Sequence, residues 1–260
     1  MVIQTGYPNL ANQGRIIAHR GASQVAPENT LAAFRAAKEQ GVNWVEFDVS
    51  LLGDMTPVVH HDATLDRCTD AEGPLAQISA SDLATIHAGK LYGATFAQEK
   101  LPTLDAVLDL LDATGMYANL EMKLHGSAPG TLADAVHFAL SMRPWSVKRI
   151  IVSSFDHDEL AALRSCMPEV AIAALWEQPP CDFRRTLSEL QAAALHLSYA
   201  YLSQGLLQEA ISYGYDVRVY TVNNPSVMAP FRAFGLTSVI TDHPPLFLND
   251  PDWAMWANEA

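Results

Sequence analysis

Short apolar runs alternate with longer amphipathic stretches along most of the chain. The runs, such as Arg15–Ala18 and Trp44–Val49, have the length of buried strands. The stretches between them repeat apolar residues at helical spacing, and the first of these follows a cap at Asn29 or Thr30 and ends at Gly41. We predict core strands near residues 16, 46, 119, 151, 172, 196, 219 and 239.

This alternation of strands and helices predicts an α/β fold. Eight strands, each but the last followed by a helix, fit within 260 residues, close to the typical size of a TIM (β/α)8 barrel. An open doubly wound sheet is the alternative. It is disfavoured because no glycine-rich dinucleotide fingerprint follows the first strand.

Residues from about 62 to 101 interrupt the rhythm. They are rich in turn-forming residues, contain one weak helical piece near Ser81–His87, and offer too little apolar surface for a core of their own. We interpret them as a small insertion after the second strand. The chain then divides into an N-terminal extension (residues 1–14), the barrel with its insertion (15–247) and a C-terminal tail (248–260).

Polar side chains gather where the first three predicted core strands end. The carboxyl ends of the strands form the active-site face of a TIM barrel, so we expect these side chains to meet at one mouth. They are His19 and Arg20 after the first strand, Glu46 and Asp48 on one face of the second, and Glu121 and Lys123 on one face of the third.

A short strand at residues 58–60 adds a further candidate to the same mouth. His61 ends this strand and is followed by Asp62. Alternation along the strand turns His60 the opposite way, so we leave it out.

These residue types together suggest phosphoryl chemistry, although each alone is more often structural. Three inward carboxylates would repel one another, and a hard divalent cation with oxygen ligands, Mg²⁺ or Ca²⁺, removes that conflict. Arg20 and Lys123 carry the charge to hold phosphate oxygens. His19 and His61 are suited to act as general base and acid.

Composition narrows the range of partners. A net charge of -13 disfavours nucleic acid, whose binding depends on clustered cations. The three cysteines show no metal-binding or paired spacing, no signal peptide is visible, and no apolar run approaches the roughly 20 residues that span a bilayer. We expect a cytoplasmic protein without stable membrane insertion, and a homo-oligomer is compatible with the sequence.

Several motifs in order resemble those of the glycerophosphodiester phosphodiesterase family. The similarity extends over residues 15–246 and covers most of the chain. Its motifs include IIAHRGASQVAPENTLAAF (16–34), VEFDV (45–49), PVVHHDATLDRCTD (57–70), NLEMK (119–123), VYTVNNP (219–225) and ITDHP (240–244).

The resemblance implies a TIM barrel with an insertion after its second strand and a role for each matching residue. It implies a catalytic pair (His19 and His61), ligands of one divalent cation, Mg²⁺ or Ca²⁺ (Glu46, Asp48 and Glu121), and phosphate-contacting cations (Arg20 and Lys123). It also implies supporting residues: Asp62 to orient a neighbouring group, Tyr220 as an aromatic floor, and Glu28 and Asn29 to shape the first loop.

The implied reaction is hydrolysis of a small-molecule glycerophosphodiester, such as glycerophosphocholine or glycerophosphoethanolamine, to sn-glycerol 3-phosphate and an alcohol. One alternative keeps the site but acts on lysophospholipids in the manner of a phospholipase D. Another is a phosphodiester-binding protein without turnover. The residues leave open which histidine is the base, and whether water or the glycerol 2-hydroxyl attacks phosphorus.

Overall fold

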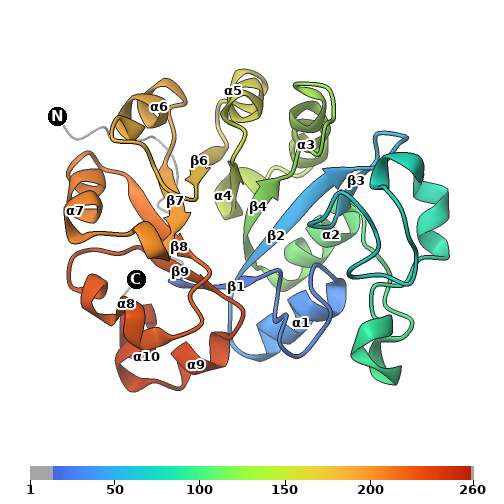
Figure 1. The fold of residues 1–260 in the computed structure, drawn as a ribbon, viewed down its shortest axis with the longest axis horizontal. Coiled ribbons are helices and arrows are strands. Elements are labelled where there is room, and N and C mark those ends of the chain that lie inside the picture. Colours follow the sequence, from blue (N-terminus) through green and yellow to red (C-terminus); the bar gives the residue numbers. More distant parts are fainter. Residues whose placement is uncertain (1–13, 259–260) are drawn as a thin grey trace.

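The computed structural model describes residues 14–258, and eight of its strands close into a parallel barrel ringed by helices (Figure 1). β1 pairs with both β2 and β9, which closes the ring and excludes the open doubly wound sheet. The predicted TIM barrel is therefore confirmed. Its strands are β1 (Ile16–His19), β2 (Trp44–Leu51), β4 (Tyr117–Met122), β5 (Ile150–Ser154), β6 (Ala171–Trp176), β7 (Ala194–Ser198), β8 (Asp216–Tyr220) and β9 (Ser238–Thr241).

Amphipathic helices cover the outside of the barrel. In the first, Thr30 is the cap, because its hydroxyl accepts a hydrogen bond from the Ala33 amide at 3.2 Å. Among the described residues, no helix is long and apolar enough to cross a membrane. The helices are α1 (Leu31–Glu39), α2 (Leu104–Thr114), α3 (Thr131–Ser141), α4 (Ser146–Arg149), α5 (His157–Cys166), α6 (Phe183–Glu189), α7 (Gln204–Ser212), α8 (Pro225–Arg232), α9 (Pro244–Leu248) and α10 (Pro251–Asn258).

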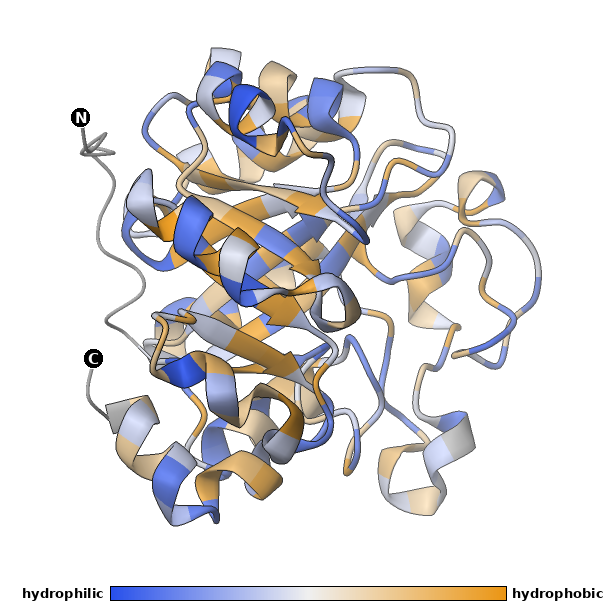
Figure 2. Ribbon diagram, turned by 60° about the vertical axis from the view of Figure 1, so that its left-hand side comes forward, coloured by the Kyte–Doolittle hydropathy of each residue, from blue (hydrophilic) through white to orange (hydrophobic). Residues whose placement is uncertain are grey.

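The main apolar core lies between the strands and these helices, and Figure 2 shows the hydrophobic residues concentrated along the strands. β2 illustrates how alternation serves both sides of the barrel wall, since all of its residues are buried. Val45, Phe47 and Val49 join the outer core, whereas Trp44 belongs to a separate cluster inside the barrel. Glu46 and Asp48, which alternate with the outer residues, share the inward side with Trp44.

The insertion begins after β3 (Pro57–Val59), which pairs antiparallel with β2 outside the ring. Isolated apolar residues from its turns pack with Leu52, after β2, and Val58, in β3, into one buried cluster, so the insertion shares this core with the strands before it. Turn residues carry no periodicity, so their sequence does not reveal that they meet. The weak helical piece is a 3₁₀ helix at Ala80–Ala84. The cluster comprises Leu52, Val58, Leu65, Leu75, Leu83, Ile86 and Leu101.

The last residues of the described chain form a helix that packs onto the barrel. Trp253 in α10 is 1% exposed, and its ring meets those of Phe247 and Trp256 edge to face at 4.9 and 5.0 Å. Of the proposed N-terminal extension, residues 1–13 lie outside the described part of the chain.

Candidate active site

Strand register brings the predicted polar residues to one end of the barrel. Asp48 on β2 lies opposite Glu121 on β4, and Glu46 lies opposite His19 on β1. Since parallel neighbours in register share a face, these side chains all point toward the barrel axis near the carboxyl ends of their strands.

Glu46, Asp48 and Glu121 form a buried carboxylate triad, in which one ligand oxygen of each residue lies within 4.8 Å of the others. Burial, reinforced by Asp48 and Glu121, raises the pKa of Glu46 well above its usual value. Burial and then Asp48 raise the pKa of Glu121 to about 7. For Asp48 burial acts in the same direction, but Lys123 and Arg20 outweigh it and lower the pKa.

The triad fits a divalent cation. Glu46 Oε1 is buried and has no hydrogen-bond partner among the described residues. Burying a carboxylate oxygen in this way is costly unless it is paired or coordinates a metal. Three oxygen donors of this kind suit Mg²⁺ or Ca²⁺, which would keep all three carboxylates ionised.

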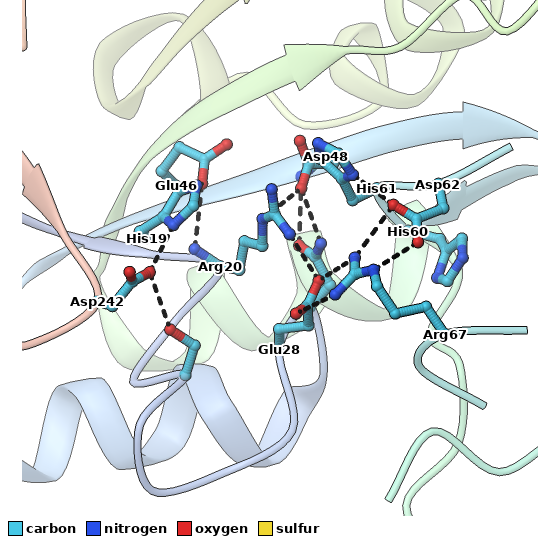
Figure 3. A network of polar contacts seen from close by, with 12 residues as sticks. His19, Arg20, Glu28, Glu46, Asp48, His60, His61, Asp62, Arg67 and Asp242 are labelled. Carbon is cyan, nitrogen blue, oxygen red and sulfur yellow. Dashed lines mark hydrogen bonds and ion pairs between the residues drawn. The ribbon is translucent and has the colours of Figure 1, made fainter. Parts of the chain in front are cut away.

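His19 approaches the triad with its Nε2 atom. Its Nδ1 lies 2.6 Å from Asp242 Oδ1, and its Nε2 lies 3.8 Å from Glu46 Oε2 (Figure 3). Asp242 is fixed in turn by Asn223, whose amide donates a hydrogen bond to Oδ2 at 2.7 Å. Burial alone would raise the pKa of Asp242, but the hydrogen bond and charge of His19 lower it to about 2. An ionised Asp242 accepts the Nδ1 proton, which leaves Nε2 free toward the triad.

His61 lies beside Asp48 and is likewise paired with an aspartate (Figure 3). Its Nδ1 lies 2.6 Å from Asp62 Oδ1. Burial lowers the pKa of His61, although the charge of Asp48 and the hydrogen bond with Asp62 oppose the shift. His60 turns away, as predicted, and its Nε2 lies 2.8 Å from the Thr64 carbonyl oxygen.

Arg20 reaches the triad from the turn that follows β1. Arg20 and Gly21 both adopt positive φ, +56° and +82°. A Cβ atom at Gly21 would lie 2.7 Å from that of Ala33, so the turn excludes larger residues. The Arg20 amide donates to Glu46 Oε2 at 3.1 Å, and Nε lies 3.2 Å from Asp48 Oδ2.

Lys123 is the second cation beside the triad. Its Nζ lies 3.3 Å from Asp48 Oδ1 and forms an ion pair with Glu121. Burial would lower its pKa, but Glu121 and Asp48 outweigh burial and raise it. Lys123 therefore stays charged, so two cations, Arg20 and Lys123, lie beside the triad.

Tyr220 contributes its ring rather than its hydroxyl. The hydroxyl donates to the Trp176 carbonyl oxygen at 2.9 Å. The ring meets that of Phe155 edge to face at 6.2 Å. Burial raises the pKa of Tyr220, which makes proton transfer from this group unfavourable. The position is suited to an apolar wall.

Several residues of this network were not identified, or were assigned another part, from the sequence. Asp242 is not among the candidates from the sequence, although its place directly after the last strand already indicates the active-site face. Asn29 was expected to shape a loop, and it donates a hydrogen bond to Asp48 Oδ2 at 2.8 Å. Glu28 accepts hydrogen bonds from Arg20 and from Arg67, and no periodicity in the insertion marks Arg67.

Comparison with known proteins identifies the group to which this site belongs. The sequence profile of the glycerophosphoryl diester phosphodiesterase family matches residues 19–246. A glycerophosphodiester phosphodiesterase of Caldanaerobacter subterraneus subsp. tengcongensis is 30% identical over 234 residues, which cover 90% of this chain and 96% of that protein. The structure of an Oleispira antarctica phosphodiesterase in complex with the product sn-glycerol-3-phosphate gives a TM-score of 0.85 at 32% identity, covering 88% of this chain and 93% of that one. Over a shorter stretch of 99 residues, human glycerophosphodiester phosphodiesterase 1 is 42% identical, covering 37% of this chain and 30% of that protein. The chain therefore belongs to the glycerophosphoryl diester phosphodiesterase family of enzymes.

Proposed function

We propose that this enzyme hydrolyses glycerophosphodiesters to sn-glycerol 3-phosphate and an alcohol, with one divalent cation and two histidines as general acid and base. Small-molecule substrates such as glycerophosphocholine and glycerophosphoethanolamine fit this reaction. The observation that carries the proposal is the pair of His–Asp contacts, both at 2.6 Å, at a buried carboxylate triad. His19 lies beside Glu46, and His61 lies beside Asp48 (Figure 3). The product complex of the Oleispira antarctica relative supports the identity of the product.

The cation would be held by Glu46, Asp48 and Glu121. When bound, it would supply positive charge to the phosphodiester and stabilise the charge that develops in the transition state. Arg20 and Lys123 would neutralise the remaining phosphate charge from the sides of the triad.

The two histidines would move the protons. One takes a proton on Nε2 from the attacking hydroxyl, of water or of the glycerol 2-position, as the new bond to phosphorus forms. The other, protonated at the start, gives its Nε2 proton to the alcohol oxygen as the P–O bond to the alcohol breaks. Attack by water gives sn-glycerol 3-phosphate directly, whereas attack by the 2-hydroxyl gives a cyclic phosphate, which a water then opens with the two histidines in exchanged roles. Asp242 and Asp62 hold the Nδ1–H groups of His19 and His61, so that each ring presents Nε2 to the reacting atoms.

The test is release of sn-glycerol 3-phosphate from a panel of glycerophosphodiesters by the wild type and two variants. We expect turnover by the wild type, and a loss of kcat on the order of 10²–10⁴ in both His19→Ala and His61→Ala. His87→Ala is the matched control, because His87 also pairs with an aspartate, Asp70 at 3.0 Å, within the insertion. Near-normal turnover in either active-site variant would contradict the two-histidine mechanism.

The panel also separates the alternatives. A preference for lysophosphatidylcholine would favour the alternative in which the enzyme cleaves lysophospholipids in the manner of a phospholipase D. Binding of glycerophosphocholine without turnover would favour a binding protein. The three free cysteines are consistent with the cytoplasmic location that we propose for the enzyme.

A further inference from the structure

Arg67, in the insertion, bridges two carboxylates beside the active site. Its Nη1 and Nη2 donate to the two oxygens of Glu28, both at 2.8 Å. Its Nε and Nη2 donate to the two oxygens of Asp62, at 2.6 and 3.1 Å. One guanidinium therefore holds two carboxylates, each by both oxygens, as Figure 3 shows.

Each of these carboxylates also holds a residue of the site. Glu28 Oε1 accepts a hydrogen bond from Arg20 Nη1 at 2.7 Å. Asp62 Oδ1 lies 2.6 Å from His61 Nδ1. A continuous chain of contacts thus connects Arg20, in the turn after β1, with His61, in the segment after β3 (Figure 3).

We propose that Arg67 is a positioning residue, which fixes His61 through Asp62 and Arg20 through Glu28. This inference rests on the proposed function, since it assigns His61 to proton transfer and Arg20 to phosphate. It gives the insertion a part in the reaction, because the insertion supplies the group that sets the orientation of a residue on each side of Asp48.

The charges support this role. The hydrogen bonds from Arg67 are the largest cause that lowers the pKa of Asp62, so they keep that carboxylate ionised and ready to accept the His61 Nδ1 proton. Burial would raise the pKa of Glu28, but hydrogen bonds from Arg67 and then the charge of Arg20 lower it to about 2. Without Arg67, Asp62 would lose its most strongly directed contacts and could rotate away from His61.

A lysine could not reproduce the arrangement. Its ammonium is a compact charge on a flexible stem, whereas the planar guanidinium fits two carboxylates at fixed angles. The Arg67 side chain is also 48% exposed, so solvent screens its ion pairs and limits what they add to stability. Replacing Arg67 should therefore disturb the alignment of the active-site residues more than it lowers the free energy of unfolding.

A purely structural role predicts a different result, and Arg143 provides the control. It also bridges two carboxylates, Asp105 at 2.9 Å and Asp109 at 2.7 Å, and it lies after α3, away from the mouth. If Arg67 only fastens the insertion, then Arg67→Gln and Arg143→Gln should both lower the melting temperature and leave kcat unchanged.

The kinetic test compares Arg67→Gln, Arg67→Lys, Asp62→Asn and Arg67→Gln/Asp62→Asn with the wild type and Arg143→Gln. We expect Arg67→Gln to lower kcat roughly ten- to a hundredfold, as loss of an outer hydrogen-bond partner typically does, with Arg67→Lys close to it. The double variant should lose less kcat than the product of the two single losses. The part of the Arg67 effect that runs through Asp62 is already lost in Asp62→Asn, whereas the part that runs through Glu28 and Arg20 remains. A kcat for Arg67→Gln like that of Arg143→Gln, or losses that multiply in the double variant, would overturn the proposal.

Chemical rescue of kcat by guanidinium ion adds a measurement that a purely structural role of Arg67 would not affect. Arg67 and Glu28 line a cavity of about 180 Å³, which gives small solutes access to the place of the guanidinium. Millimolar guanidinium ion should restore part of the kcat lost in Arg67→Ala, and should not restore Asp62→Asn. Equal responses of the two variants would count against the assignment.

A spectroscopic measurement separates this inference from the proposed function. In protein labelled with ¹⁵N-histidine, Arg67→Gln should shift or broaden the His61 Nδ1 signal and leave that of His19 unchanged. Unchanged His61 signals would overturn the inference even if the wild type hydrolyses glycerophosphodiesters. A wild type without such activity would instead refute the proposed function, and the His61 signals would still decide the role of Arg67.

Discussion

Replacing Asp242 with asparagine should impair the enzyme more than replacing it with alanine. The reason lies in Asn223, whose amide orientation is fixed: its Oδ1 accepts from the Thr241 hydroxyl at 3.1 Å and from the Asp242 amide at 2.9 Å. Its Nδ2 must then donate to residue 242. An asparagine at 242 would turn its oxygen toward Asn223 and its NH₂ group toward His19 Nδ1. That NH₂ group would force the proton of a neutral His19 onto Nε2, which prevents action as a base. It would also face the Nδ1–H of a protonated His19, which disfavours the form needed by an acid.

The magnitude follows from the two effects. Loss of the charge-assisted hydrogen bond at 2.6 Å costs about 1.5–3 kcal/mol, or about ten- to a hundredfold in rate. Asp242→Ala should show this loss alone, because water can pair with either tautomer of His19. Asp242→Asn adds the wrong tautomer, so its kcat should fall by on the order of 10²–10⁴.

The assay is release of sn-glycerol 3-phosphate at saturating substrate, with the tautomer of His19 read from its ¹⁵N chemical shifts. We expect Nδ1–H in the wild type and Nε2–H in Asp242→Asn. A milder effect of asparagine than of alanine, or an Nδ1–H tautomer in Asp242→Asn, would refute the reasoning.

Three further predictions concern stability and the cation. The pKa values of Glu28 and Asp242 are about 2 in the folded state and about 4 in the unfolded state, so both groups stabilise the fold above pH 4, and their contribution disappears as the pH falls through 2. The free energy of unfolding, measured in urea, should therefore fall less on acidification in Glu28→Gln than in the wild type. Equal losses would contradict this prediction. The pKa of Glu121 is raised to about 7, so without a cation its ionisation destabilises the fold progressively as the pH rises from about 4.5 through 7. Mg²⁺ or Ca²⁺ should therefore raise the melting temperature more at pH 8 than at pH 5. Equal shifts of the melting temperature would argue against a cation site at the carboxylates. Trp253→Ala should lower the free energy of unfolding by about 3–5 kcal/mol and leave kcat unchanged, and a loss of kcat in the folded variant would show that α10 does more than pack.

The barrel and the inner residues of the site could be predicted because strands impose a period of two. Once Val45, Phe47 and Val49 are taken as core, Glu46 and Asp48 must face inward. The same rule correctly excludes His60.

Partnerships between loops could not be predicted in this way. Asp242 and His19 are separated by 223 positions, and no local pattern indicates that they meet. Arg67 lies in a segment of turns, where alternation carries no information about direction. The cluster that the insertion shares with β3 could not be predicted for the same reason, because Leu65 and Leu75 join it only when the backbone folds back.

The most direct test of the account is the dependence of turnover on the cation. Protein dialysed against EDTA, and shown by elemental analysis to be free of divalent metal, is assayed for sn-glycerol 3-phosphate release from glycerophosphocholine before and after Mg²⁺ or Ca²⁺ is returned. We expect no turnover by the metal-free wild type, recovery with one of the two ions, and no recovery in Glu46→Gln. Full turnover by the metal-free wild type would contradict the proposed role of the carboxylate triad.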